Sequence, residues 1–305
     1  MTSLGDARVA IVSRIFAPEP AAAAPRLAAV AQALTDAGAE VTVITTTVPG
    51  MTGGPETDDS APYDVRCVPA LRDRDGYIRG YVNYMSFDIP AFFRLVFSKR
   101  FDAVIVEPPP TTGVFIRAAA WLRRTPYLFY AADVWSEAAD VAGTPKVMVS
   151  VVRAFEDWAY RGAARVLSMS ASVSRRVSRS ASGARVETVG NGYDSTVFRP
   201  DGPRIERSPC PLYAGTASEV HGAGVFVDAM PLLLTKHPED KLVFIGQGAD
   251  WSVGEDVSDI AAAMIEVFSA QGSSARRLEL AERTRQRLSL QSVGARVADA
   301  VGAVI

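Results

Sequence analysis

The apolar residues of the first half of the chain alternate between short continuous runs and helical spacing. Residues 9–12 form a continuous run, Leu27, Val30 and Leu34 then recur at helical intervals, and residues 41–44 form the next run. Continuous apolar runs are typical of parallel strands that are covered on both faces. This β-α-β rhythm predicts an α/β fold, with a parallel sheet that has helices on its faces.

The same rhythm continues to about residue 190. Further strands are predicted at 65–68, 103–106, 127–131, 165–167 and 186–189. Helices are predicted from residue 110 to about 122 and over 147–161, where Val151, Ala154, Phe155 and Trp158 share one face. We therefore expect a first domain over residues 1–190.

The alternation of predicted strands and helices begins again after a polar stretch at 200–203, but it ends after two strands. Strands are predicted at 212–215 and 242–245, with a helix over 224–234 between them, and only helices follow, at 256–268, 275–288 and 291–304. Two strands are few, because sheets usually have about 4–6. We expect an interdomain elbow over 191–203, a shortened second domain over 204–288, and a terminal helix over 289–305 that packs back on the first domain.

Composition narrows the class of protein. The 305 residues carry a net charge of −2, which gives no global attraction to nucleic acid. Cys67 and Cys210 are too few for a disulfide framework, and no secretory signal or bilayer-spanning apolar run is visible. The two histidines and two cysteines have no metal-ligand spacing. We expect a cytoplasmic protein, with the inner face of the membrane as an alternative location, that needs neither metal nor cofactor.

Glycine-rich turns follow both strands of the second half. Gly215-Thr216 follows the first strand, and Gly246 and Gly248 follow the second. Glycine lets the backbone approach a phosphate, and the next helix N-terminus favours negative charge there. The same glycines could serve only as tight turns. His221 precedes the helix of this half, where it would contact a phosphate or cap the helix.

Polar residues also follow strands of the first half, at the edge where open parallel sheets bind ligands. Arg26 lies beyond the turn 13–20 and would reach a phosphate or be a solvated surface residue. Asp133, Trp135 and Glu137 follow the strand at 127–131. A carboxylate there can orient a sugar hydroxyl or act as a base, and a tryptophan can stack on a sugar. A helix cap and a core tryptophan would explain the same residues.

Aromatic and basic residues crowd residues 77–100, Tyr81 and Tyr84 among them. This combination suits an anionic interface or a lipid-linked acceptor. A partly buried helical hairpin is the simpler alternative. Stacking on nucleic acid would use similar residues, but the sequence pI of about 5.8 disfavours it.

Several short motifs, taken in order, resemble those of glycosyltransferase family 4, which has the GT-B fold. The first half contributes FAPEP at 16–20 with Arg26-Leu27, EPPP at 107–110 and DVWSE at 133–137; the second contributes NGYD at 191–194 with FRP at 198–200, YAGT at 213–216 and FIGQG at 244–248. Each motif is weak by itself, and their order carries the resemblance, which spans about 1–250 and resumes near 251–305.

The resemblance implies two Rossmann-like, doubly wound domains that face a cleft. It implies transfer of a sugar, with retention, from a nucleotide-diphosphate donor to a cell-surface or lipid-linked glycan, without a metal. We accordingly assign Asp133 as catalytic and two sets of binding residues. The donor side comprises Arg26, Asn191, Gly215, Thr216, His221, Gly246 and Gly248, and the acceptor side comprises Trp135, Glu137, Tyr81 and Tyr84.

Departures from the family pattern define the alternatives. Alanines at 22 and 23 replace a common glycine pair, Ala132 stands where many relatives have histidine, and the Glu-x7-Glu segment of the donor domain is missing. Segments that the family separates adjoin at Asp250 and Trp251, so the donor domain is incomplete, either through an internal deletion or because a stretch is absent from the sequence. A catalytically degenerate binding or interaction protein is therefore the alternative function. A nucleotide-sugar epimerase ranks last, because its His and Glu constellation is missing.

Overall fold

The described part of the chain forms two compact units. A computed structural model describes residues 3–19, 21, 23–47, 61–73, 78, 80–141, 143–196, 212–214, 223–236, 238, 242–245 and 282–305. One unit combines Met1–Asp140, Pro145–Phe198 and Arg283–Ile305, and the other combines Val141–Thr144 and Arg199–Glu282. The first unit therefore draws on both ends of the chain.

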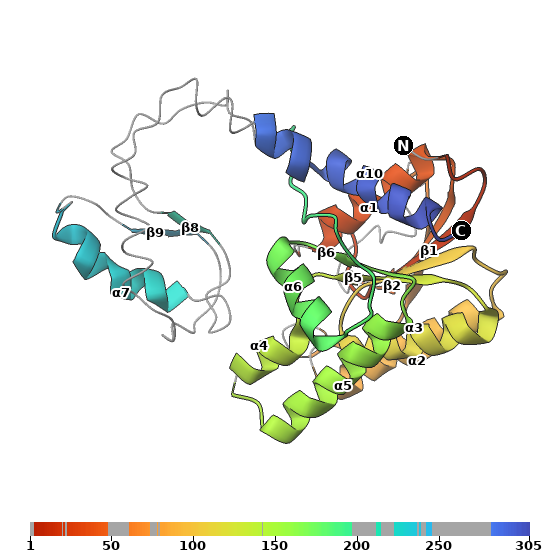
Figure 1. Ribbon diagram of the computed structural model, residues 1–305, viewed down its shortest axis with the longest axis horizontal. Helices are drawn as coiled ribbons and strands as arrows, with labels where there is room; N and C mark the ends of the chain where they lie inside the picture. The colour runs from red at the N-terminus through yellow and green to blue at the C-terminus, as the bar shows by residue number, and fades with distance from the viewer. Residues whose placement is uncertain are drawn as a thin grey trace. The chain divides into compact units, whose positions relative to one another are not determined.

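A seven-stranded parallel sheet is the centre of the first unit (Figure 1), with the order β3-β2-β1-β4-β5-β6-β7. Its strands are β1 (Arg8–Val12), β2 (Glu40–Thr46), β3 (Asp64–Val68), β4 (Ala103–Val106), β5 (Tyr127–Ala131), β6 (Arg165–Ser168) and β7 (Val186–Thr188). All seven predicted strands are confirmed. Their central members are buried on both faces, which explains the continuous apolar runs.

Helices cover both faces of this sheet. They are α1 (Ala23–Asp36), α2 (Tyr81–Phe97), α3 (Pro110–Arg123), α4 (Trp135–Val141), α5 (Lys146–Gly162), α6 (Ala171–Ser180) and α10 (Leu290–Gly302). One core cluster joins the sheet to α1 and α10. The other joins it to α2, α3, α5 and α6. In Figure 1 the blue α10 lies against the red-orange α1, so the last helix of the chain covers the first.

One expectation for a helix is wrong, and the structure shows which way the apolar face of another points. The aromatic segment forms the single long helix α2 where the simpler alternative was a hairpin. In α5, the buried side chains are Val149, Val152, Glu156, Ala159 and Tyr160. The helix itself is confirmed, and its predicted apolar face, with Val151, Ala154, Phe155 and Trp158, is exposed. Periodicity located an apolar stripe but did not say which way it faces.

The second unit contains a small parallel sheet of β8 (Leu212–Ala214) and β9 (Val243–Ile245), in which Leu212 pairs with Val243. Helix α7 (Ala223–Leu234) lies between these strands in sequence, as predicted. The predicted helix at 256–268 and the junction of Asp250 and Trp251 lie outside the described residues. Of the helices that the structure describes, none has both the length and the apolar character to cross a membrane.

Candidate active site at the carboxyl edge of the sheet

The candidate site is built on residues that directly follow the parallel strands of the first unit. Ser13 and Arg14 follow β1, Glu107 follows β4, and Asp133 comes shortly after β5. Because all the strands run the same way, their carboxyl ends share one edge. Residues distant in sequence are thereby brought together where open α/β sheets bind ligands.

A buried ion pair occupies the centre of this edge. Arg26, which is only 4% exposed, donates from its guanidinium Nη2 to the Glu107 carboxylate. Its Nη1 donates to Asn191 Oδ1 at 2.5 Å and lies 3.4 Å from the sulfur of Met169. Ser13 Oγ donates to the second carboxylate oxygen of Glu107 at 2.9 Å. The sequence-predicted residues Arg26 and Asn191 thus contact each other directly, across 165 positions of sequence.

Tyr130 forms the floor of this network. The Arg26 guanidinium carbon lies 5.1 Å from the centre of the Tyr130 ring, an arrangement typical of a cation–π contact. The Tyr130 hydroxyl donates to the Gly190 carbonyl at 2.7 Å. Burial raises the pKa of Tyr130, so the phenol stays protonated and remains a donor. The end of β7, where Asn191 begins the elbow, is therefore fixed by side chains from α1 and β5.

A second cluster places Arg14 between two aromatic rings. Its guanidinium carbon lies 4.3 Å from the Tyr84 ring centre and 5.5 Å from that of Trp135. The two rings meet edge to face at 6.0 Å, and Tyr81 continues the row at 6.4 Å from Tyr84. Burial lowers the pKa of Arg14, whose Nη1 donates to the Ile78 carbonyl at 3.0 Å. Three of the four predicted acceptor-side residues thus lie in one row.

A buried carboxyl group lies among the same elements. Asp88 of α2 is fully buried and accepts a hydrogen bond from the Thr112 hydroxyl at 2.6 Å. Its other carboxylate oxygen has no hydrogen-bond partner among the described residues. Burial raises the pKa of Asp88 to about 6, against the opposing effects of the nearby threonine hydroxyls and Arg14.

The segment that carries Asp133 is held by an acid from another helix. Glu156 of α5 accepts hydrogen bonds from the backbone N–H of Trp135 at 2.6 Å and of Ser136 at 2.9 Å. These contacts cap the start of α4. Capping by Asp133 was the alternative explanation considered for that residue from the sequence. The Asp133 side chain is exposed instead. Glu137 pairs with Arg176 at 3.1 Å, with both side chains about half exposed.

Asp88 and Glu156 were not expected at the site, and Arg14 was only part of a predicted turn. Arg14 follows a strand directly, and that position is a signal that sequence reasoning can use. No such signal marks Asp88 or Glu156, because both lie within helices. Of the donor-side residues, Gly215, Thr216, His221, Gly246 and Gly248 lie outside the described part of the chain.

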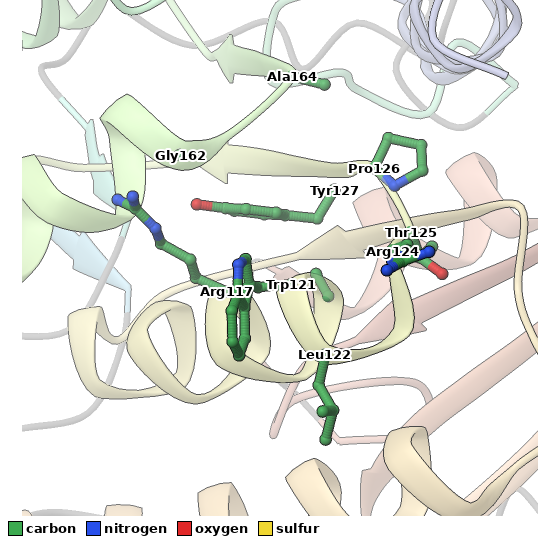
Figure 2. A pocket seen from close by; sticks show the side chains of 10 residues that line it. Arg117, Trp121, Leu122, Arg124, Thr125, Pro126, Tyr127, Gly162 and Ala164 are labelled. Carbon is green, nitrogen blue, oxygen red and sulfur yellow. The ribbon is translucent and has the colours of Figure 1, made fainter.

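A pocket of about 720 Å³ lies at the opposite, amino edge of the sheet. It is formed by the end of α3, the start of β5 and the turn after α5 (Figure 2). Its lining includes Arg117, Trp121, Arg124 and Tyr127. Cavity volume and the convergence of polar side chains therefore point to different edges. We place the candidate active site at the carboxyl edge, where the charged and aromatic groups converge.

Comparisons with known proteins agree with this architecture. Similar solved structures include sucrose-phosphate synthase from Thermosynechococcus elongatus, with 12% identity, a TM-score of 0.69, and coverage of 98% of this chain and 99% of that one. Anabaena Alr3699/HepE in complex with UDP-glucose has 10% identity and a TM-score of 0.56, with 97% and 99% covered. Arabidopsis thaliana UGT89C1 complexed with UDP-L-rhamnose has 12% identity and a TM-score of 0.52, also with 97% and 99% covered.

These identities are low, so the similarities show the fold alone, which is the expected GT-B class. No curated protein matches the chain. A family model described as a glycosyl transferase 4-like domain matches residues 22–192, which is more than half of the chain and includes Arg26, Glu107, Asp133 and Asn191. The chain therefore belongs to the glycosyl transferase 4-like family.

Proposed function

We propose that this protein transfers a sugar, with retention, from a nucleotide-diphosphate donor to a cell-surface or lipid-linked glycan. The observation that carries the proposal is the juxtaposition of exposed Asp133 with the row formed by Trp135, Tyr84 and Tyr81 at the carboxyl edge. Aromatic faces stack on sugar rings, and a carboxylate beside them can orient or deprotonate a hydroxyl. Nucleotide sugars in two similar structures support the donor class.

Roles follow from these positions. Asp133 orients the acceptor hydroxyl or acts as its base. Trp135, Tyr81 and Tyr84 hold the acceptor, with Glu137 beside them on α4. Asn191 takes the donor side, and Arg26 contributes by fixing Asn191, since its guanidinium already binds Asn191 and Glu107. For the second unit, we propose that Gly215, Thr216, His221, Gly246 and Gly248 bind the donor, with protein hydrogen-bond donors that stabilise the departing diphosphate.

The location is part of the proposal. We place the protein in the cytoplasm at the inner face of a membrane, where lipid-linked acceptors are found. The aromatic and basic residues of 77–100 support peripheral contact with that membrane.

Thermal shift with UDP- and GDP-sugars tests donor binding, and release of free nucleotide tests turnover. At least one donor should raise Tm, and Asp133→Asn should lower turnover by about 100-fold while leaving the donor shift intact. Asp140→Asn is the matched control, because Asp140 is an exposed acid farther along the same segment. If no donor stabilises the protein, the claim of a competent site fails.

The alternative function is a degenerate binding protein, and the missing Glu-x7-Glu segment favours it. A donor that raises Tm without any release of nucleotide, with or without glycan acceptors, would support that alternative. Asp133→Asn would then change neither measurement.

A further inference from the structure

Exposed apolar side chains gather where α2 and α3 end, at the amino edge of the sheet. Phe97 and Trp121 are each 81% exposed, far more than large aromatic residues usually are. The two helix ends adjoin, because Arg123 donates to the Ser98 carbonyl at 3.0 Å and Arg100 donates to the Arg124 carbonyl at 2.9 Å. We call this surface the amino-edge patch, comprising Phe93, Phe97, Trp121 and Leu122.

The patch does not serve the core of its own unit. The rings of Phe93 and Phe97 stack at 6.0 Å with only 5° between their planes, yet both remain exposed. The core beneath them is filled by other side chains of the same helices, such as Leu95 and Ala119. Exposed aromatic side chains that gather at adjoining helix ends are typical of an interaction site.

Positive charge surrounds the patch. Residues 89–101 and 108–132 contain no aspartate or glutamate, although the whole chain is slightly acidic. Their cationic side chains are Arg94, Lys99, Arg100, Arg117, Arg123 and Arg124. Lys99, Arg100 and Arg124 are exposed, so a positive field extends into solvent beside the aromatic rings.

The amino-edge pocket adjoins the patch, since Trp121 and Leu122 belong to both. Figure 2 shows Arg117 and Arg124 on different sides of the pocket, with the Tyr127 ring between them. Its volume of about 720 Å³ lies within the range that binds small molecules. Arginine side chains favour phosphate through their N–H donors. One nitrogen of Arg117 already donates to the Trp158 carbonyl, which holds this side chain at the pocket wall, whereas Arg124 is exposed.

We propose that the amino-edge patch docks on an anionic lipid bilayer, with a headgroup phosphate in the pocket between Arg117 and Arg124. Aromatic rings flanked by basic side chains match the interfacial layer of an anionic membrane, where rings enter the headgroup region and cations bind lipid phosphates. The absence of acidic residues from both segments favours a uniformly negative partner. This inference rests on the membrane contact proposed above and names the surface that makes it.

Docking in this way gives the two ends of α2, within the aromatic segment 77–100, different functions. Tyr81 begins α2 and Phe97 ends it, a length of about 24 Å at the usual helical rise. The start of α2 contributes to the sugar site, and its end contributes to the membrane surface. The sugar site therefore stands away from the bilayer, which suits an acceptor whose glycan extends from the membrane.

Vesicle co-sedimentation of the full chain tests the assignment. Wild type should sediment with vesicles containing phosphatidylglycerol and far less with pure phosphatidylcholine. Phe97→Ser combined with Trp121→Ser should weaken binding by about tenfold or more, because the two rings that would enter the bilayer are lost. Lys99→Gln combined with Arg124→Gln should reduce the preference for anionic vesicles. Val82→Ser, an exposed change at the other end of α2, is the matched control and should bind as wild type.

Several outcomes would overturn the proposal: no vesicle binding by wild type, equal binding to neutral vesicles, or binding that the patch variants leave unchanged. Binding of inorganic phosphate without vesicle binding would assign the pocket to a free anion. A dimer that the Phe97 and Trp121 changes dissociate in sedimentation velocity would assign the patch to a second copy. The donor-induced shift in Tm, measured on the same variants, should be unchanged. If no donor raises the Tm of wild type but wild type binds anionic vesicles, the proposal of sugar transfer is refuted and the proposal of a docking surface is retained.

Discussion

Glu156 shows how one buried side chain determines the position of a candidate catalytic segment. Its two carboxylate oxygens accept the first N–H groups of α4, and the Tyr160 hydroxyl donates to the same carboxylate at 3.3 Å. Burial raises the pKa of Glu156, and the hydrogen bonds oppose that rise. The path of the chain from Asp133 to Trp135 therefore depends on a residue of α5.

Glu156→Ala should lower the free energy of unfolding by roughly 1–3 kcal/mol, because N–H groups at the start of α4 lose their acceptors. Glu156→Gln should cost less, since the amide oxygen still accepts one bond. Urea unfolding measures both. Glu137→Gln is the control, because its exposed ion pair should contribute less than about 1 kcal/mol. Equal effects of the Glu156→Ala and Glu137→Gln changes would contradict this account.

The Arg26–Glu107 pair should behave as a buried ion pair whose two partners depend on each other. Glu107→Ala should destabilise the protein by about 3–5 kcal/mol, because the Arg26 charge is left buried without its counterion. The double variant Arg26→Met, Glu107→Leu should recover much of that loss. A double-mutant cycle from urea unfolding measures the coupling, and strictly additive costs would refute it.

Asp88 gives stability a predictable dependence on pH. Its pKa is about 6 in the folded state and close to 3.8 when unfolded, so between these values the folded state binds the extra proton. The contribution of the protonated Asp88 carboxyl to the free energy of unfolding is fully present below about pH 4, and it is lost as pH rises through about 6. Arg14 and Thr112 face the carboxyl group and moderate the effect.

Asp88→Asn should remove this dependence, since the amide does not ionise. Wild type should therefore lose stability relative to the variant by on the order of 3 kcal/mol between pH 4 and pH 7. Urea unfolding of both proteins at pH 4, 5, 6 and 7 measures the difference. A difference that stays constant or grows in favour of wild type would be inconsistent with a raised pKa.

At the scale of elements, the contact of α1 with α10 depends on a glycine. A Cβ added at Gly294 would lie 2.6 Å from the Cβ of Ala33 and 3.1 Å from the carbonyl oxygen of Ala29. Neither neighbour is a flexible side chain that can turn aside. The small residue therefore sets how closely the two helices approach.

Gly294→Ala should destabilise the protein by about 1–3 kcal/mol, although alanine favours helix, because the two helices must separate. Gln291→Ala, an exposed change in the same helix, should be nearly neutral. Thermal unfolding of the two variants measures the contrast. A Gly294→Ala protein as stable as wild type would show that α10 can shift without cost.

At the scale of the molecule, the first unit is completed by the end of the chain. Helix α10 buries Val297, Ala298, Ala300 and Val301 in the core shared with α1, and its Val293 is also buried. The three valines alone contribute on the order of 5 kcal/mol, which approaches the whole stability of a typical domain. The fold of residues near the N-terminus therefore depends on residues near the C-terminus.

A chain ending at residue 282 should consequently lose the cooperative unfolding transition of its first unit, or show a much lower Tm. A chain that lacks only Ile305, an exposed residue after α10, should unfold like wild type. Near-UV circular dichroism during heating measures both. An unchanged transition after removal of α10 would contradict the dependence.

Local pattern was sufficient for the strands of the first unit, because the central strands are buried on both faces and so appear as continuous apolar runs. It also placed Asp133, Trp135 and Arg26 near the carboxyl edge, since strand ends are visible in sequence. It did not predict the outward face of α5, because an apolar stripe has the same spacing whether it meets the core or solvent.

Tertiary structure decided which distant side chains meet. Glu156 reaches the start of α4 across 20 and 21 positions, Thr112 reaches Asp88 across 24, and Arg26 reaches Asn191 across 165. The amino-edge patch likewise exists only because the ends of α2 and α3 adjoin. Sequence by itself determined the elements and the family, because both depend on local residue order. The contacts within the site depend on tertiary packing, because packing brings together residues that no local pattern relates.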